Sequence, residues 1–462
     1  MQATPRASFV QLPAEMLDLI LQYLRSTQFL GIRGVSRRWR QAVDDSLERR
    51  HHLHLTGDDV RHANDERLER LLRRMPSLRR LTTDHDCCSP RPPLSVDVVS
   101  RLLGHMVEVD LLHFDAAPQP LEGLWTRCPR LGAVTLPRRC AEQCAAVLLR
   151  RLPSLRRLDV AWSDVLGECL SLLPESLEAL SVAWCRHVQP AWLRQLTRCP
   201  RLRRLDVSGV KGLQAADLAA VLAGCPQLER LTTWELEPAL ELCLPPTGLP
   251  SLRYLDVTWS GGVTDATLQR LPDLLPGLHT LHTGVCGGVT AVGLDSLPRL
   301  RQLCELDLSR LTVTDFTLDR LHGPGLRMLN LSGCRPCSTD GVTRLVLGCP
   351  SLTVLGWWVR PNIRRTRPLV DSLVRHLPPN RDVILEVNGG DLQDLQDLQD
   401  LLRPGPLSLR EYKSWGLFSG LVPGGLHEQG SWRRRRLQRC MLKYRCRAAA
   451  VGQQEASSAA SS

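Results

Sequence analysis

Aromatic residues, long apolar runs and secretory features are scarce or missing in this sequence. Phe, Trp and Tyr make up only 4% of its 462 residues. The apolar runs fall far short of the roughly 20 residues that a membrane-spanning helix needs, so we expect no membrane span. The first sixteen residues contain no apolar signal core, so we expect no secretory signal. Without such a signal, the 17 cysteines indicate reduced thiols and a cytoplasmic and/or nuclear location rather than disulfides.

The common catalytic and metal-binding motifs are also missing. We find no G-x-x-x-x-G-K, H-E-x-x-H, G-x-S-x-G or G-x-G-x-x-G string in a fitting context, so no catalytic residues and no cofactor are expected. Cys334-x-x-Cys337 lacks the second pair that a zinc finger would supply. The ligand-rich string Asp84–Cys88 falls in a predicted loop before Pro90. We therefore predict no metal site.

Charge is unevenly spread along the chain. Residues 401–462 carry 11 Lys/Arg against 3 Asp/Glu, a net charge of +8, which leaves +3 of the total +11 for residues 1–400. A nearly balanced body makes nucleic-acid binding by the fold itself an unfavoured hypothesis. Residues 391–462 combine a three-residue repeat, a Pro/Gly-rich stretch and the basic cluster Trp432–Arg436. Their composition predicts a low-complexity, basic, mostly disordered tail, whose basic cluster is either a nuclear import signal, a contact for an anionic surface or a solvated charge run.

The strongest positive feature is an internal repeat. The frame L-x-x-L-x-L, or a close variant, recurs eleven times, and from the second copy onward the spacing is 22 to 26 residues. Worn copies, Met106–Leu111 and Asn380–Leu385, extend the array. Such regularity predicts a repeat architecture. The leading leucines are Leu78, Leu131, Leu155, Leu177, Leu202, Leu228, Leu252, Leu278, Leu303, Leu326 and Leu352.

Each repeat predicts a short strand followed by a return segment. Alternate leucines of the frame point inward, and no single repeat can bury them alone, so the units must stack. Thr264 and Thr314 are placed to cap helices, and the Asp after each favours a first helical turn. The predicted fold class is therefore α/β, a leucine-rich-repeat solenoid over residues 51–390 with a curved parallel sheet inside and helices outside.

Cysteines occur at repeated places in this frame. They stand before proline or just after the strand, and this pattern resembles the cysteine-containing subclass of leucine-rich repeats, which is common in F-box proteins. The resemblance covers roughly residues 70–390 of the sequence. The cysteines concerned are Cys128, Cys185, Cys199, Cys225, Cys286, Cys334 and Cys349.

Three short helices are predicted before the repeats. Pro13 suits a first helical turn, and one face of the helix that follows collects Met16, Ile20, Tyr23 and Leu24. Phe29, Leu30, Val35 and a third helical stretch, Ser36–Val43, come next. Three helices in about 40 residues bury little surface and tend to expose apolar side chains to a partner.

This segment, residues 8–50, resembles an F-box. The matching strings are L-P-x-E-x-x-x-x-I-L-x-Y-L and V-S-R-R-W-R, and Gln28 departs from the family, which often has an acidic residue there. The resemblance implies docking on a Skp-type adaptor, and through it on a cullin–RING ubiquitin ligase. The implied adaptor-binding residues are Leu12, Pro13, Ile20, Leu24, Val35 and Trp39. The alternative is a non-ligase interaction scaffold in which these helices only cap the array.

The strand frame also predicts which side chains face the concave side. Arginines recur at its third position and aspartates at its fifth, while tryptophans follow at the seventh and eighth. Tryptophan and arginine dominate binding hot spots, so we predict that a protein substrate, of unknown identity, binds the tryptophans. The alternative is that the charges pair laterally and the tryptophans pack on neighbouring turns. The predicted substrate-binding residues are Trp162, Trp184, Trp234, Trp259 and Trp358. The predicted function is the non-catalytic, substrate-recognition subunit of an SCF-type ubiquitin ligase.

Overall fold

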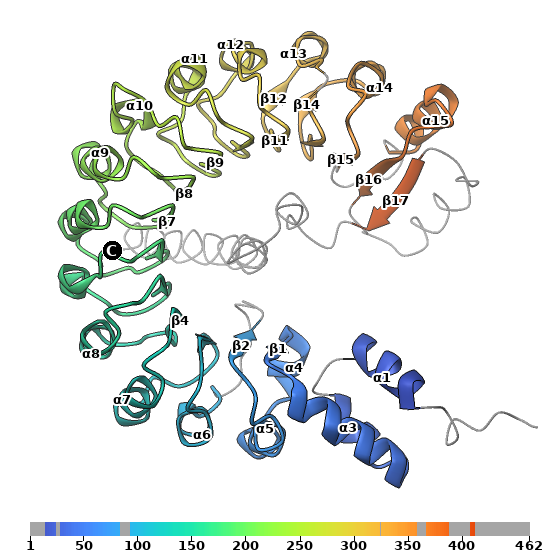
Figure 1. The fold of residues 1–462 in the computed structure, drawn as a ribbon. Helices are drawn as coiled ribbons and strands as arrows, with labels where there is room; N and C mark the ends of the chain where they lie inside the picture. The colour runs from blue at the N-terminus through green and yellow to red at the C-terminus, as the bar shows by residue number, and fades with distance from the viewer. Residues whose placement is uncertain are drawn as a thin grey trace, which may run out of the picture. The chain divides into compact units, whose positions relative to one another are not determined.

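The computed structural model describes residues 14–24, 28–83, 93–323, 325–357, 366–387 and 407–411. The chain divides into two compact units, one of Met1–Asp159 with Ser419–Ser462 and the other of Val160–Phe418. In both units short parallel strands alternate with helices (Figure 1).

The first unit begins with three helices and continues with strand–helix repeats. The helices are α1 (Ala14–Tyr23), α2 (Phe29–Ile32) and α3 (Arg37–Arg49). The strands pair in chain order and in parallel, as β1 (His52–Leu55), β2 (Arg80–Thr83), β3 (Glu108–Asp110), β4 (Ala133–Thr135) and β5 (Arg157–Asp159). The helices between them are α4 (Gly57–His62), α5 (Asp65–Leu72), α6 (Val96–Leu102), α7 (Pro118–Arg127) and α8 (Glu142–Arg151).

The second unit repeats the same strand–helix alternation. Its main strands also pair in parallel and in chain order: β6 (Ala179–Ser181), β7 (Arg204–Asp206), β8 (Arg230–Thr232), β9 (Tyr254–Asp256), β10 (Thr280–His282), β11 (Glu305–Asp307), β13 (Met328–Asn330), β15 (Val354–Gly356), β16 (Val383–Val387) and β17 (Leu407–Glu411). A small sheet joins β12 (Thr312–Val313) to β14 (Arg335–Pro336).

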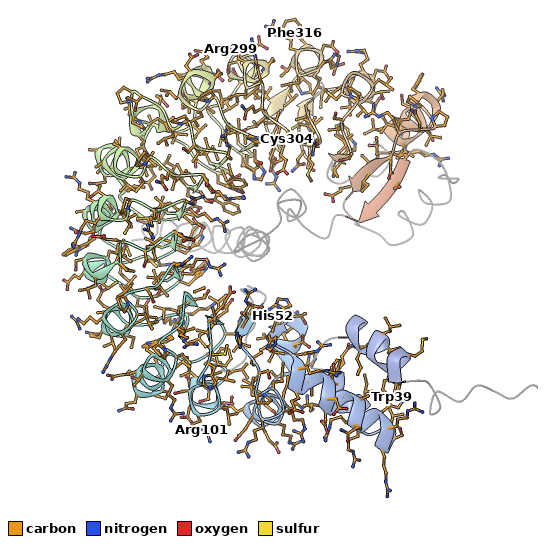
Figure 2. The ribbon with its side chains drawn as sticks, viewed as in Figure 1. Trp39, His52, Arg101, Arg299, Cys304 and Phe316 are labelled. Atoms are coloured by element: carbon orange, nitrogen blue, oxygen red, sulfur yellow. The ribbon has the colours of Figure 1, made fainter. Side chains whose placement is uncertain are left out.

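Helices of α and 3-10 type return the chain from one strand of the second unit to the next. Figure 2 shows Phe316, a helix residue, on the helix side of this unit and Cys304 beside the strands. The helices are η3 (Glu168–Leu172), η4 (Pro190–Arg198), α9 (Ala215–Gly224), α10 (Leu240–Cys243), α11 (Asp265–Leu274), α12 (Ala291–Leu294), η5 (Leu297–Arg299), α13 (Asp315–Arg320), α14 (Thr339–Gly348) and α15 (Thr366–His376).

The leucine frame forms the core, as the repeat predicts. Every leading leucine is buried except Leu303, which is half-buried. The worn copies form strands too: Met106–Leu111 contains β3, and Asn380–Leu385 overlaps the start of β16. The leucine-rich-repeat fold class is therefore confirmed.

The helix caps also form at the predicted positions. Thr264 and Thr314 are the N-caps of α11 and α13. The carboxylate of Asp265 reaches the next repeat, where it accepts hydrogen bonds from the backbone N–H groups of Thr290 at 2.7 Å and Gly293 at 3.0 Å. An acidic residue after the cap thus ties one repeat to the next.

Cysteine thiols form a second set of ties between repeats. The thiols of Cys185, Cys286 and Cys334 lie 3.0–3.1 Å from backbone carbonyls of the preceding repeat. Burial raises the pKa of both Cys225 and Cys286 to about 12. These thiols therefore stay protonated and act as buried hydrogen-bond donors.

Strand β17 lies inside the segment 391–462, for which the composition predicts disorder. Its five residues form a parallel pair with β16 instead, because the stacked sheet supplies backbone partners that composition does not reveal. The other residues of the predicted tail lie outside the described part of the chain, and the domain limits at 50 and 390 stay predictions.

Two further expectations concern membranes and metals. None of the described helices combines the length and the apolar composition that a membrane crossing requires. Among the described residues, no three His, Cys, Asp or Glu side chains are grouped to hold a metal ion. Asp84–Cys88 lies outside the described residues.

Candidate functional site

The three N-terminal helices share a small apolar core. The buried side chains come from all three helices: Leu17 and Leu21 from α1, Phe29 from α2, and Val43 and Leu47 from α3. Helix α3 is stabilised at its start because the Ser36 hydroxyl accepts a hydrogen bond from the backbone N–H of Trp39 at 3.2 Å.

Three apolar side chains of this segment are exposed. Met16 and Leu19 of α1 are 45% and 48% exposed, and Val35, between α2 and α3, is 57% exposed. Contiguous exposed apolar patches are typical of surfaces that a partner covers, whereas single exposed apolar side chains are common on any protein. We name Met16, Leu19 and Val35 the apolar helical face.

The predicted adaptor-binding residues fall into different environments. Val35 lies on the apolar helical face, and Ile20 and Leu24 are half-buried. Trp39, on α3, is only 6% exposed and belongs to the interior (Figure 2). Leu12 and Pro13 lie outside the described residues. The assignment of these residues to adaptor binding stays a prediction.

Sequence reasoning missed Leu19 and did not assign Met16. Helix α1 reads AEMLDLILQY, with apolar residues around much of its circumference. In such a helix spacing alone cannot separate the buried stripe of Leu17 and Leu21 from the exposed one. Only contact with α3 decides which stripe faces inward.

The second candidate surface is a rim that follows the strands of the second unit. One residue per repeat there adopts a left-handed backbone, with φ of +66° at Trp162, +61° at Trp184 and +65° at Trp259. The equivalent position in other repeats has the same left-handed backbone and is filled by Gly209, Glu235, Val285, Arg310 and Gly333. A bulky residue in this conformation costs about 1–3 kcal/mol, whereas glycine adopts it freely.

Two of the rim tryptophans stack on one another. The ring centroids of Trp162 and Trp184 are 5.6 Å apart and their planes differ by 16°. A Cβ built on Gly209 would come within 2.4 Å of the Trp184 ring, so the absent side chain leaves the space that the indole fills. We call Trp162, Trp184 and Trp259, all half-buried, the tryptophan rim.

The other two predicted tryptophans are Trp234 and Trp358. Trp234 is 4% exposed and its backbone N–H donates to the Ser208 hydroxyl at 3.1 Å, so it is an interior residue in the described structure. Trp358 lies outside the described residues. The alternative hypothesis, in which tryptophans pack on neighbouring turns, describes Trp162 and Trp184, although both stay partly accessible.

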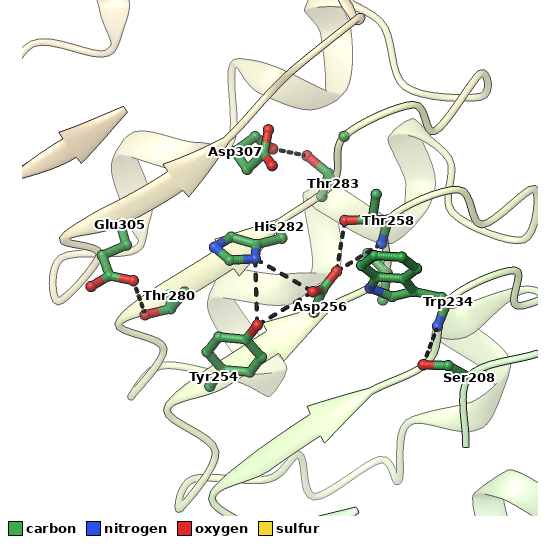
Figure 3. Close-up of polar contacts among 12 residues, drawn as sticks. Ser208, Trp234, Tyr254, Asp256, Thr258, Thr280, His282, Thr283, Glu305 and Asp307 are labelled. Atoms are coloured by element: carbon green, nitrogen blue, oxygen red, sulfur yellow. Dashed lines mark hydrogen bonds and ion pairs between the residues drawn. The ribbon is translucent and has the colours of Figure 1, made fainter. Parts of the chain in front are cut away.

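A polar cluster occupies the face of β9 and β10 opposite to the core leucines Leu255 and Leu281 (Figure 3). Asp256 Oδ2 lies 3.4 Å from His282 Nδ1 and 3.3 Å from the Tyr254 hydroxyl. Its other oxygen accepts hydrogen bonds from the hydroxyl of Thr258 at 2.7 Å and from the backbone N–H of the same residue at 3.0 Å. The guanidinium of Arg230 stacks on the Tyr254 ring, 4.0 Å from its centroid.

Two carboxylates on β11 extend this cluster. Glu305 accepts a hydrogen bond from the Thr280 hydroxyl at 3.2 Å, and Asp307 accepts one from the backbone N–H of Ser309 at 2.9 Å. Burial raises the pKa of Glu305 above its ordinary value and that of Asp307 to about 6. These groups lie on strands 25 or more residues apart in sequence, and only the fold brings them together.

Burial and neighbouring charges act in opposite directions on the cationic members. Burial alone would lower the pKa of His282, but the hydrogen bond and charge of Asp256, with the charges of Asp307 and Glu305, raise it above its ordinary value. Burial and the charge of Arg204 lower the pKa of Arg230 to about 9, against the raising effect of Glu305, Asp256 and Glu229. The strand frame predicts arginine and aspartate on the concave side, at the positions of Arg230, Asp256 and Asp307. It does not single out His282 and Tyr254, because neither residue type recurs at its position in other repeats.

Comparisons with known proteins match the two parts separately. Residues 9–54 match the F-box-like family model. Lysine-specific demethylase 2A of Xenopus tropicalis is 29% identical over 181 residues, which are 37% of this chain and 12% of that protein's length. The match therefore spans about an eighth of that relative.

A solved structure resembles the chain in fold. A chain of the Rad7–Elc1 complex of yeast superposes with a TM-score of 0.50 at 16% identity, over 75% of this chain and 91% of that one. The likeness concerns the fold alone. The chain thus has an F-box-like domain at its N-terminal end followed by a parallel solenoid of the leucine-rich-repeat type.

Proposed function

We propose that this chain is the substrate-recognition subunit of an SCF-type ubiquitin ligase. Its F-box-like helices would bind a Skp-type adaptor, and through it a cullin–RING ligase, in the cytoplasm and/or nucleus. The observation that carries the proposal is the apolar helical face. Met16, Leu19 and Val35 are exposed within residues 9–54, which match the F-box-like family model. The ubiquitin chemistry would belong to other subunits, so this chain is proposed to be non-catalytic.

The solenoid would supply the substrate surface. The tryptophan rim supports this role because three partly accessible indoles recur at one position of the repeat. Partly accessible indoles are also the commonest anchors of protein interfaces.

The adaptor hypothesis predicts a large effect of charge on the apolar helical face. Leu19→Asp with Val35→Asp should lower co-purification of a Skp-type adaptor by at least 100-fold, because two carboxylates would be desolvated in the complex. The thermal melting of the chain should stay within a few degrees, since both side chains already face water. Pull-down with purified adaptor measures the first quantity and calorimetry the second.

The matched control uses equally exposed apolar residues elsewhere. Leu242 and Val292 are 66% and 61% exposed on helices of the second unit. Leu242→Asp with Val292→Asp should leave adaptor binding unchanged. Equal binding by the wild type and the Leu19/Val35 variant would show that this face does not hold the adaptor.

The alternative function is a scaffold in which the three helices only cap the solenoid. It is favoured by one observation: α3 ends at Arg49 and β1 begins at His52, so the helices lead directly into the first repeat. Capping and adaptor binding can coexist, but a pure cap predicts no affinity for any Skp-type adaptor. Pull-down with wild-type protein decides between them.

The tryptophan rim yields a second prediction. Trp162→Ala, Trp184→Ala and Trp259→Ala together should reduce capture of substrate proteins more than tenfold, because truncating each hot-spot residue costs about 2 kcal/mol or more. Melting should fall by only a few degrees. Capture is measured by affinity purification and mass spectrometry from cells. The compared chains both carry Leu19→Asp and Val35→Asp, which prevent turnover of the captured substrates.

A control for the rim is Phe316→Ala, which removes an exposed aromatic side chain from α13. It should leave the captured proteins unchanged. If the triple variant instead unfolds, the indoles are core residues and the binding role proposed for them is wrong.

A further inference from the structure

One side chain contacts both helices that frame the apolar helical face. Arg50 follows α3 directly and its Nη2 donates a hydrogen bond to the backbone carbonyl of Leu21, in the last turn of α1, at 2.8 Å. Its guanidinium carbon also lies 4.5 Å from the centroid of the Phe29 ring, on α2. Arg50 therefore joins α1 and α2 to the point where α3 passes into β1.

Both contacts suit a guanidinium. The last carbonyls of a helix lack partners within the helix and carry partial negative charge, so a cation there is stabilising. An arginine above a phenyl face adds an attractive cation–π contact. Burial lowers the pKa of Arg50 from its ordinary value, yet an arginine remains charged in a protein. The Arg50 guanidinium therefore makes both contacts as a charged and partly buried group.

A second tie starts from the middle of α3. Asp44 pairs with Arg33, at the end of α2, at 2.7 Å, and with Arg74, just after α5, at 3.6 Å. Arg33 and Arg74 therefore share one carboxylate, which connects the helical unit to the first repeat. These pairs are partly exposed and contribute modestly. They join α2 and α3 to the first repeat, whereas the contacts of Arg50 reach α1.

The apolar helical face is discontinuous in sequence. Met16 and Leu19 come from α1, whereas Val35 follows α2. A partner that covers all three side chains needs a fixed angle between these helices. A tie that contacts both helices sets that angle without belonging to the face.

We propose that Arg50 is a positioning residue for adaptor binding: by joining α1 and α2 to the start of β1 it holds the apolar helical face in its binding arrangement. The inference rests on the proposed function and names the residue that sets its geometry. The F-box-like helices would then depend on the junction with the first repeat. A truncated chain that ends immediately before residue 50 would lose this tie.

The test compares three substitutions in the full-length chain. Arg50→Ala should raise the Kd for a purified Skp-type adaptor about tenfold, mainly through faster dissociation. Arg50→Lys should recover part of the loss, because an ammonium can donate to the Leu21 carbonyl but lacks the planar guanidinium that stacks on Phe29. Arg49→Ala, at the neighbouring exposed position, should stay within twofold of the wild type.

Hydrogen exchange separates positioning from folding. In Arg50→Ala the amides of α1 and α2 should exchange faster, while that of Trp39, held by the Ser36 cap, should be unchanged. Adaptor binding within twofold of the wild type would overturn the proposal, and so would uniform loss of protection across α1, α2 and α3. Absence of adaptor binding by the wild type would contradict the proposed function itself, and exchange would still report whether Arg50 fixes the two helices.

Discussion

Gly262→Ala is expected to lower the free energy of unfolding by about 3 kcal/mol or more, the cost of forcing an atom into a fully packed site. A Cβ at this position would lie 1.9 Å from the carbonyl oxygen of Pro238 in the preceding repeat. The backbone cannot move aside easily, because the Gly262 N–H donates to the Leu236 carbonyl and its carbonyl accepts from the Leu240 N–H, both at 3.0 Å. Chemical denaturation measures the loss.

The adjacent glycine is a matched control. A Cβ on Gly261 meets nothing within 4 Å, so Gly261→Ala should change the unfolding free energy by less than about 0.5 kcal/mol. Equal effects of the two substitutions would show that close approach between repeats does not require glycine at residue 262.

Asp307→Asn is expected to stabilise the chain by about 2–3 kcal/mol at pH 7.5. Burial raises the pKa of Asp307 from 3.8 to about 6, so the folded state binds its proton more tightly than the unfolded state does. Ionisation of Asp307 therefore opposes folding. The stabilisation that the protonated carboxyl gives is complete below pH 4 and is lost as the pH rises through about 6. Asparagine keeps an oxygen to accept the Ser309 N–H and removes the charge.

The pH dependence checks this assignment. The advantage of Asp307→Asn should be near zero at pH 4 and should grow up to about pH 7, as measured by denaturation at a series of pH values. Asp319→Asn is the control, because Arg344 lowers the pKa of that exposed carboxyl, so its neutralisation should bring no gain at neutral pH. A stability difference for Asp307→Asn that is independent of pH would exclude ionisation as its cause.

The sequence by itself determined the repeat architecture and the character of the N-terminal segment. The frame L-x-x-L-x-L, the threonine caps at Thr264 and Thr314 and the cysteine positions are local features whose effect depends on residues within one or two repeats. A strand that buries alternate leucines needs only the next copy of itself to form a core. The same locality made the worn copies at β3 and β16 recognisable.

Tertiary structure alone decided which residues of those elements are accessible. Helix α1 is apolar on several sides, and packing against α3 buries Leu17 and Leu21 while it leaves Met16 and Leu19 exposed. The repeat frame predicts both its seventh and its eighth position on the accessible side, yet Trp234, at the seventh, is buried, whereas Trp162 and Trp184, at the eighth, form a half-buried stack. His282 acquires its partners from strands one repeat away on either side. The burial and the charge environment of a side chain depend on contacts with segments distant in sequence. They therefore follow from the packed structure rather than from the spacing of residues along the chain.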